Sequence, residues 1–307
     1  MKVHKIVIGS RGSQLALWQA NWVKAELERL HSNVDINIRV ITTSGDKIQD
    51  VPLAKIGGKG LFVKEIEEAL LAKEVDLAVH SMKDVPMEIP AELVVSVITK
   101  RESSLDALIS KNGERLVNLP QGATIGTSSL RRSSQLLKYR VDFKIHPLRG
   151  NVDTRLRKVK TGNYDAIILA SAGLNRLGWT SHITEEISEE ILLPAMGQGA
   201  LGIETRLDDT KTYDFISTLN HKQTNYAVTA ERALVGRLDG GCQVPIGAYA
   251  KIENNLISLK GLVASLDGET IYTSENTGPV DDAINIGQEL GSRLLKMGAN
   301  EILEKLI

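Results

Sequence analysis

Strand-like and helix-like segments alternate from residue 5 to residue 169, and this alternation is the feature that most restricts the fold. The strand-like segments are short apolar runs or strict apolar–polar alternations, and most are followed by segments with apolar residues at helical spacing. The predicted strands are Lys5–Ile8, Val34–Val40, Val75–Val79, Leu93–Ile98, Thr124–Gly126, Phe143–Pro147 and Ala166–Leu169, and the predicted helices are Gln14–Leu30, Leu61–Leu71, Ser129–Lys138 and Asn151–Thr161. Such alternation predicts an α/β fold with largely parallel sheets, in two α/β domains of similar build.

The pattern changes after Leu201. A long helix is predicted over Asn220–Leu238, and a closing helix over Val280–Leu306 is broken near Gly298. Between them lie three strand-like runs, Ile246–Ile252, Leu256–Leu266 and Thr270–Glu275, with two-residue hairpin turns predicted at Asn254-Asn255 and Asp267-Gly268. This part of the chain therefore predicts a small α+β domain with a three-stranded antiparallel sheet.

Composition excludes several classes of protein. The 307 residues are 42% hydrophobic and 24% charged, which is ordinary for a globular chain and argues against disorder. No run approaches the roughly 18 apolar residues that a membrane span requires, and the first residues lead straight into a strand without a signal-peptide pattern. The single cysteine excludes an internal disulfide and a multi-cysteine metal site. We expect a cytoplasmic protein with no metal and no membrane partner.

Positive charge is concentrated in one segment. Residues 131–160 hold ten Lys or Arg and two Asp, a net charge of +8, so the rest of the chain carries −9. A local excess of this size favours a polyanionic partner. Nucleic acid is one candidate, but aromatic residues make up only 4% of the chain, fewer than stacking on single strands requires. A small ligand with several carboxylates or phosphates fits as well.

Arginines stand at three predicted strand-to-helix junctions. The junctions are residues 9–13 with Arg11, residues 126–132 with Arg131 and Arg132, and residues 149–155 with Arg149 and Arg155. Ser13, Ser129 and Asn151 are good N-cap residues for the helices that follow. A cation in the first helical turn is unfavourable unless an anion docks there, because the helix end already carries positive partial charge. The alternative is a solvated basic helix face.

Two further segments carry residues suited to catalysis. Asp84 follows a predicted strand and has Lys83 beside it, a pattern also typical of a surface turn, and a carboxylate there could stabilise a cationic intermediate. Cys242 lies on a Gly-Gly/Pro loop, which favours a nucleophile or an attachment point over an inert core residue. The glycine-rich segments 57–60 and 197–200 are interpreted as a lid and a hinge, and neither is a phosphate-binding loop of the Walker type.

Seven ordered segments resemble the porphobilinogen deaminase (hydroxymethylbilane synthase) family of haem biosynthesis, and the resemblance covers essentially the whole chain. They are Ser-Arg-Gly-Ser-Gln-Leu-Ala-Leu-Trp-Gln (10–19), Gly-Gly-Lys-Gly-Leu-Phe (57–62), His-Ser-Met-Lys-Asp-Val-Pro (80–86), Gly-Thr-Ser-Ser-Leu-Arg-Arg (126–132), Arg-Gly-Asn-Val-Asp-Thr-Arg (149–155), Pro-Ala-Met-Gly-Gln-Gly-Ala-Leu-Gly-Ile-Glu (194–204) and Gly-Gly-Cys-Gln-Val-Pro-Ile-Gly (240–247).

The resemblance implies three domains. Two are α/β domains like those of type II periplasmic binding proteins, and the third is the α+β unit with its three-stranded antiparallel sheet. The first domain would comprise residues 1–99 and 200–217, the second residues 100–199 with hinge segments near 100 and 195–199, and the third residues 218–307, which include the cofactor cysteine.

The resemblance also implies the activity. Cys242 would carry a dipyrromethane cofactor through a thioether, and four porphobilinogens would be added in sequence with loss of ammonia before hydrolysis releases a linear tetrapyrrole. Asp84 would be the catalytic carboxylate, which contacts pyrrole N–H groups, stabilises the cation left by the loss of ammonia and manages the proton removed when the ring regains aromaticity. The implied cofactor-binding residues besides Cys242 are Lys83, Thr127, Ser129, Arg131, Arg132 and Arg155, and the implied substrate-binding residues are Arg11, Ser13, Lys55, Lys59, Arg149, Arg176 and Gln198.

Family members of this kind act as monomers on a small molecule, with neither nucleic acid nor membrane as a partner, and we expect the same here. The alternative from another class is a non-catalytic two-domain protein that binds a polyanion, since the binding-protein fold also serves transport receptors and regulators.

Overall fold

The computed structural model describes residues 4–47, 60–240 and 244–306, which form two compact units. Residues 1–101 with 200–225 form the N-terminal unit, and residues 102–199 with 226–307 form the second unit. Lys55, Lys59 and Cys242 lie outside the described residues. The second unit contains two separate sheets. The division into three domains remains a prediction.

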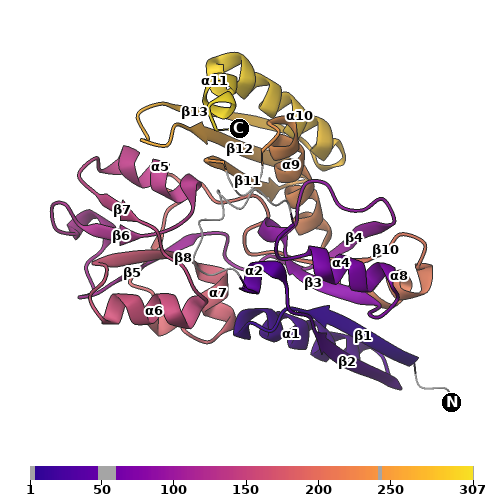
Figure 1. The fold of residues 1–307 in the computed structure, drawn as a ribbon. Coiled ribbons are helices and arrows are strands. Elements are labelled where there is room, and N and C mark those ends of the chain that lie inside the picture. Colours follow the sequence, from indigo (N-terminus) through magenta and orange to yellow (C-terminus); the bar gives the residue numbers. More distant parts are fainter. Residues whose placement is uncertain (1–3, 48–59, 241–243, 307) are drawn as a thin grey trace. The chain divides into compact units, whose positions relative to one another are not determined.

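The N-terminal unit is built on a five-stranded sheet in the order β2-β1-β3-β10-β4 (Figure 1). Its strands are β1 (His4–Ser10), β2 (Val34–Val40), β3 (Leu77–Ser81), β4 (Leu93–Ile98) and β10 (Leu201–Arg206). β1 pairs in parallel with β2 and β3, whereas β10 runs antiparallel between β3 and β4. The middle of this sheet is thus completed by a strand that lies far along the chain.

Helices cover both faces of this sheet. The main helices are α1 (Gln14–Leu30), α4 (Lys64–Leu71) and α8 (Thr210–Ile216), and the shorter elements are α2 (Ser44–Lys47), η1 (Met82–Asp84) and η4 (Ser217–Leu219). α1 buries Val23 and Leu27 in one apolar core, and α4 buries Ile66 and Leu70 in another. The carboxyl ends of β1 and β3 lead into α1 and η1, which places both turns at the same edge of the sheet.

The larger sheet of the second unit has the order β7-β6-β8-β5-β9. Its strands are β5 (Asp106–Ser110), β6 (Thr124–Gly126), β7 (Lys144–His146), β8 (Ala166–Ala170) and β9 (Glu185–Ile187). β6 is parallel to β7 and β8, and β5 runs antiparallel to both of its neighbours. Its helices are α5 (Leu130–Tyr139), α6 (Val152–Lys160) and α7 (Ser171–Arg176), with short turns η2 (Leu116–Asn118) and η3 (Thr180–His182).

The chain ends in a three-stranded antiparallel sheet of β11 (Ile246–Glu253), β12 (Leu256–Ala264) and β13 (Ile271–Pro279). The helical elements of this part are α9 (Lys222–Arg237), η5 (Val280–Asp282), α10 (Ala283–Leu294), η6 (Leu295–Ala299) and α11 (Asn300–Glu304). Leu234 of α9 and Leu290 of α10 both approach Gly261 of β12, so the two helices cover one face of the sheet (Figure 1).

The fold class is confirmed: two five-stranded α/β sheets and a three-stranded antiparallel sheet. The predicted break at Gly298 is also confirmed, since this residue has φ 114° within the closing helices. The turn at Asn254-Asn255 is confirmed as well, because both residues have positive φ and the ladder closes from Glu253 to Leu256.

The two-residue turn predicted at Asp267-Gly268 is wrong. The ladder between β12 and β13 already ends at the pair Ala264 and Ile271, so a longer loop joins these strands. Within this loop Ser265 and Thr270 are hydrogen-bonded, and Gly268 has φ 73°. The strands β5, β9 and β10 and the helices α2, α7 and α8 were not predicted from the sequence. Within the described ranges, no helix has the length and apolar character to cross a membrane.

Candidate functional site

Three residues predicted from the sequence line one pocket in the N-terminal unit. Arg11, Ser13 and Asp84 surround it, together with Gln19, Phe62, His80 and Ser81 among others. Arg11 and Ser13 follow β1, and Asp84 ends η1, which follows β3. Because β1 and β3 are parallel neighbours, both turns come from the same sheet edge, where ligands bind in α/β proteins.

Ser13 is the N-cap of α1. Its hydroxyl accepts a hydrogen bond from the Ala16 N–H at 3.3 Å, as expected from the sequence. The remaining N–H groups of the first turn point toward the pocket end of the helix, where they attract negative charge. Asp84 is exposed and Lys83 is half-buried.

Arg11 is bound by a carboxylate that the sequence did not indicate. Its Nε donates to Asp46 at 3.2 Å, its Nη2 donates to the same carboxylate, and its guanidinium carbon lies 4.2 Å from the centre of the Phe62 ring. Burial raises the pKa of Asp46, but hydrogen bonds from Arg11 and Thr43 outweigh burial and hold this pKa below its usual value. The Arg11 guanidinium is therefore fixed in place within the pocket.

Lining residues of the pocket take part in two polar pairs, one part-buried and one buried. Gln19 Nε2 of α1 donates to Ser81 Oγ at 3.0 Å. His80 Nε2 lies 3.0 Å from Glu204 Oε2 on the neighbouring strand β10. The sequence indicated neither pair, since their partners are 62 and 124 residues apart.

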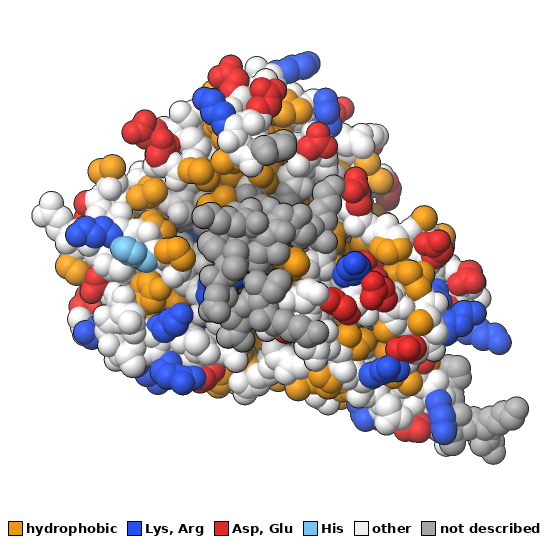
Figure 2. All heavy atoms as spheres, in the orientation of Figure 1, with side chains coloured by type: hydrophobic (Ala, Val, Ile, Leu, Met, Phe, Trp, Pro, Cys, Tyr) orange, Lys and Arg blue, Asp and Glu red, His pale blue; other side chains and the backbone are white. Residues whose placement is uncertain are grey.

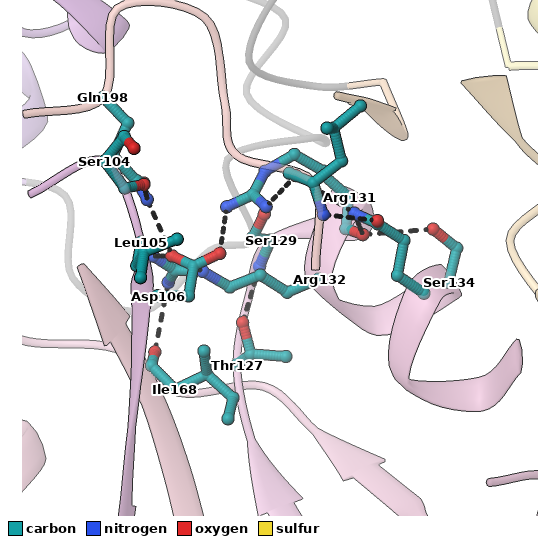
Figure 3. Close-up of polar contacts among 12 residues, drawn as sticks. Ser104, Leu105, Asp106, Thr127, Ser129, Arg131, Arg132, Ser134, Ile168 and Gln198 are labelled. Atoms are coloured by element: carbon teal, nitrogen blue, oxygen red, sulfur yellow. Dashed lines mark hydrogen bonds and ion pairs between the residues drawn. The ribbon is translucent and has the colours of Figure 1, made fainter. Parts of the chain in front are cut away.

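In the second unit, Arg131 and Arg132 converge on the buried carboxylate of Asp106 (Figure 3). Arg131 Nη2 donates to Asp106 Oδ2 at 2.8 Å, and Arg132 donates to Oδ1 from Nε at 3.0 Å and from Nη2 at 2.6 Å. Burial would raise the pKa of Asp106, but the charges of both guanidinium groups hold it far below its usual range. Two cations thus share one anion in a site away from water.

Main-chain carbonyls complete the contacts of these arginines. Arg131 Nη1 donates to Leu193 O at 2.6 Å, and Arg132 Nη1 donates to Ile168 O at 3.1 Å. Among the described residues, further N–H groups of both guanidinium ions have no hydrogen-bond acceptor. The cluster of Asp106, Arg131 and Arg132 has a formal charge of +1, which suits a further carboxylate from a ligand.

Gln198 belongs to the same network. Its Nε2 donates to Asp106 Oδ1 at 3.0 Å and to Ser104 O at 2.6 Å, and the side chain is buried (Figure 3). The next residue, Gly199, has φ +91°, and a Cβ there would lie 2.4 Å from Glu102 O. Glu231 of α9 holds the chain before Gln198 in place, since its carboxylate accepts hydrogen bonds from the N–H of Gly197 at 2.7 Å and from that of Ala250 at 2.8 Å.

Thr127 and Ser129 lie between β6 and α5, just before the arginine pair. Thr127 is buried, and its hydroxyl accepts the Ser129 N–H at 3.2 Å. Ser129 is the N-cap of α5, but its side chain makes no capping hydrogen bond. Asn151, at the third junction, caps α6 by accepting the Thr154 N–H at 2.9 Å. All three predicted N-cap residues are confirmed in position, although the Ser129 hydroxyl makes no capping hydrogen bond.

The remaining predicted arginines of the second unit have different surroundings. Arg155 Nε donates to Gly150 O at 2.7 Å, while the half-buried Arg149 has no carboxylate partner among the described residues. Arg176 Nη2 donates to Gly199 O at 2.6 Å. Burial lowers the pKa of Arg176 to about 10, which still leaves it charged at neutral pH.

The +8 segment does not form one basic surface. Arg131 and Arg132 are buried, Arg140 pairs with Asp142, and Arg157 pairs with Asp153. On the face drawn in Figure 2, Lys and Arg side chains are interspersed with Asp and Glu side chains. Four of the ten cations of this segment thus lie in the buried cluster or in surface ion pairs.

The predicted residues therefore form two described groups. Arg11, Ser13 and Asp84 share the pocket of the N-terminal unit, and Arg131, Arg132 and Gln198 share the Asp106 cluster of the second unit. Asp46, Asp106, His80 and Glu204 were not predicted. A charged residue inside the apolar run Leu-Asp-Ala-Leu-Ile was the available signal for Asp106.

Known proteins match the chain over its length. A family model described as the dipyrromethane cofactor binding domain of porphobilinogen deaminase matches residues 6–214, and one described as the C-terminal domain of the same enzyme matches residues 225–296. The porphobilinogen deaminase of Geobacter sulfurreducens is 53% identical over 306 residues, covering 100% of this chain and 96% of that protein. That of Trichlorobacter lovleyi is 53% identical over 304 residues, covering 99% and 97%.

A solved structure of a YaeC-family lipoprotein from Enterococcus faecalis is similar at 13% identity, covering 77% of this chain and 97% of that chain with a TM-score of 0.42. The family models span most of the chain, and the relatives named above share half of its residues, which confirms the resemblance seen in the seven sequence segments. The chain belongs to the porphobilinogen deaminase family of transferases and contains its dipyrromethane cofactor binding domain.

Proposed function

We propose that the protein is a hydroxymethylbilane synthase that condenses four porphobilinogen molecules head to tail, releasing ammonia at each step, and then frees the linear tetrapyrrole by hydrolysis. The observation that carries this proposal is the joint presence of Arg11, Ser13 and Asp84 in one pocket. The pocket offers a guanidinium group already oriented by Asp46 and a helix N-terminus for substrate carboxylates, beside the Asp84 carboxylate for a developing cation.

The residues of the second unit suit the dipyrromethane cofactor. Arg131 and Arg132 have one buried anion between them, so their surplus charge can pair with an acetate or propionate of the cofactor. We assign Lys83, Thr127, Ser129 and Arg155 as further contacts and Cys242 as the attachment point. When bound, the cofactor supplies the pyrrole ring that is extended.

Substrate carboxylates are assigned to the remaining cations. Porphobilinogen carries an acetate and a propionate, and Arg11, Arg149 and Arg176 present guanidinium groups suited to them. Ser13 adds a hydroxyl, and Lys55 and Lys59 add ammonium groups. Gln198 is assigned to substrate binding through an indirect role. Its amide is hydrogen-bonded to Asp106 and Ser104, so it supports the carboxylate that holds Arg131 and Arg132.

Asp84 is assigned the electrostatic part of the chemistry. Loss of ammonia from porphobilinogen leaves positive charge on the ring and its methylene carbon. A carboxylate that accepts the pyrrole N–H stabilises this charge in the transition state more than in the ground state.

Intact-mass spectrometry tests the proposal. The purified protein should exceed its sequence mass by two pyrrole units, and a Cys242→Ser variant should not, because a hydroxyl is a poorer nucleophile than a thiol at neutral pH. The wild type should also release ammonia from porphobilinogen. Binding of porphobilinogen without ammonia release would instead identify a non-catalytic polyanion-binding protein.

We further propose that the enzyme acts in the cytoplasm as a monomer, on a small molecule and without nucleic acid. Light scattering coupled to size-exclusion chromatography checks the first point, with a mass of about 33.5 kDa expected. A stable dimer in that experiment would contradict it.

A further inference from the structure

The proposed function leaves unused a buried pair of ionisable residues at the Asp84 pocket. His80 lies on β3 and Glu204 on β10, and these strands are antiparallel neighbours. His80 is opposite Gly202 and Ala78 is opposite Glu204, so both side chains lie on the face of the sheet that α4 covers. With no side chain at Gly202, His80 and Glu204 meet diagonally across the two strands.

Both members of the pair are removed from water. His80 is 6% exposed and Glu204 is 1% exposed, and His80 Nε2 lies 3.0 Å from Glu204 Oε2. The second oxygen of Glu204 is buried and has no hydrogen-bond partner among the described residues. The contact with Glu204 therefore fixes the orientation of the His80 ring.

His80 is also one of the residues that line the pocket. His80 lines it together with Asp84, and only Nε2 of its ring is hydrogen-bonded to another described residue. In the tautomer that donates Nε2–H to Glu204, the lone pair of Nδ1 is available to accept a proton. A carboxylate that orients an imidazole in this way stabilises the imidazolium formed when a proton arrives.

Glu67 is a third ionisable group that interacts with His80 and Glu204. Glu67 of α4 is half-buried, and burial together with the charge of Glu204 raises its pKa to about 7, while His80 acts in the opposite direction. The charged groups on Glu67's own helix and on the strands that pack against it are Lys64, Glu65 and Glu68 of α4, Glu204 and Arg206 of β10, His80 of β3 and the exposed Lys5 of β1. The described residues thus place two carboxylates near a single imidazole.

The proposed reaction requires a proton acceptor. When the α-carbon of a pyrrole attacks the methylene carbon, a C–C bond forms and the α-carbon still carries its hydrogen. Breaking that C–H bond returns its electron pair to the ring and releases one proton. The ammonia that has left can become ammonium only by taking up a proton.

We propose that His80, oriented by Glu204, is a proton acceptor in this pocket and receives at Nδ1 the proton lost from the pyrrole α-carbon. The imidazolium then returns the proton to the departing ammonia or to water, so that the pair is restored after each condensation. The family resemblance assigns both tasks to Asp84; here Asp84 keeps the stabilisation of the cation, and His80 removes the proton. This inference rests on the proposed function.

Kinetics of three variants test the assignment. His80→Gln removes the proton acceptor, and Glu204→Gln keeps a hydrogen-bonding oxygen but removes the charge. Glu68→Gln, on the exposed side of α4, is the matched control. We expect kcat to fall by about 10²-fold in the first two variants, a loss typical of general-base catalysis, and to stay within twofold in the control.

Two readouts separate proton transfer from a structural role. With porphobilinogen deuterated at its free α-carbon, the isotope effect on kcat should rise in His80→Gln and Glu204→Gln, because C–H cleavage becomes slower than the other steps. Intact mass should show that both variants still carry the two pyrrole units. If His80→Gln fails to fold, Glu204→Gln alone decides the matter.

Wild-type kcat and an unchanged isotope effect in the folded variants would overturn the role of His80. So would a rate loss without any rise in the isotope effect. A wild-type protein that releases no ammonia from porphobilinogen would refute the proposed function itself, so the two failures are distinguishable.

Discussion

Two nitrogens of Arg132, Nε and Nη2, donate hydrogen bonds to the same oxygen of Asp106, Oδ1. The other oxygen receives Arg131, so a single buried carboxylate sets the orientation of both guanidinium groups. Arginine side chains have many rotamers, and this arrangement removes most of that freedom before any ligand binds. The second unit therefore presents its two central cations already oriented.

Asp106→Asn should destabilise the protein strongly. The substitution leaves two buried guanidinium groups without an anion, and breaking a buried pair in this way costs about 3–5 kcal/mol. Urea unfolding of the variant and the wild type measures the difference. Asp153→Asn is the control, because its partner Arg157 is exposed and such pairs are worth about 0–1 kcal/mol. Equal losses in the two variants would contradict the importance of the buried cluster.

Asp84→Asn should impair chemistry and leave binding intact. The amide keeps the shape and a hydrogen-bonding oxygen but removes the charge that stabilises the cation. We expect kcat to fall by about 10²–10⁴-fold, while native mass spectrometry still shows porphobilinogen loaded on the enzyme. A near-wild-type kcat would show that another group stabilises the cation.

Arg149→Leu should weaken substrate binding and leave the fold intact. Arg149 is half-buried and has no carboxylate partner among the described residues, so its guanidinium is available to a ligand. Losing one charge-assisted hydrogen bond costs about 1.5–3 kcal/mol, which corresponds to a KM raised roughly 10–150-fold or to accumulation of one intermediate chain length. Arg157→Leu is the control, since that arginine is exposed and paired with Asp153. The same KM in both variants would exclude Arg149 from binding.

Glu67→Gln should stabilise the protein at pH 8 and have little effect at pH 5. The folded protein raises the pKa of Glu67 from 4.5 to about 7, so folding is opposed by its ionised form. The resulting cost is absent below pH 4.5, grows between pH 4.5 and 7, and is fully present above pH 7. Between pH 5 and 8 the melting temperature of the variant should therefore fall less steeply with rising pH than that of the wild type. Parallel curves for variant and wild type would mean that Glu67 is not perturbed.

The sequence predicted the regular elements well where a local pattern defines them. α1, β2, β4 and β6 have the predicted bounds, because each is a helical or strand repeat enclosed by turn residues. β5 and β10 were missed for a common reason. Each contains a buried charged residue, Asp106 or Glu204, which interrupts the apolar run that indicates an internal strand.

The site was predictable only in part. Arg11, Ser13 and Asp84 stand at strand ends, and the topology of a parallel sheet brings such positions together. The partners Asp46 and Asp106 could not be assigned, because the distance of 35 or 25 residues to each arginine contains no local pattern. Their pairing depends on how complete elements pack, which a single sequence does not encode in any short segment.

The position of β10 has a consequence for synthesis on the ribosome. Among the described residues β4 pairs only with β10, so the first hundred residues leave the ribosomal tunnel before the partner of β4 has been made. Residues 102–199 complete a sheet of their own before Leu201–Arg206 emerges. The internal sheet can thus mature first, which reverses the usual order in which the N-terminal part folds first. Until β10 emerges, the edges of β3 and β4 that it covers are open to pairing with strands of other chains.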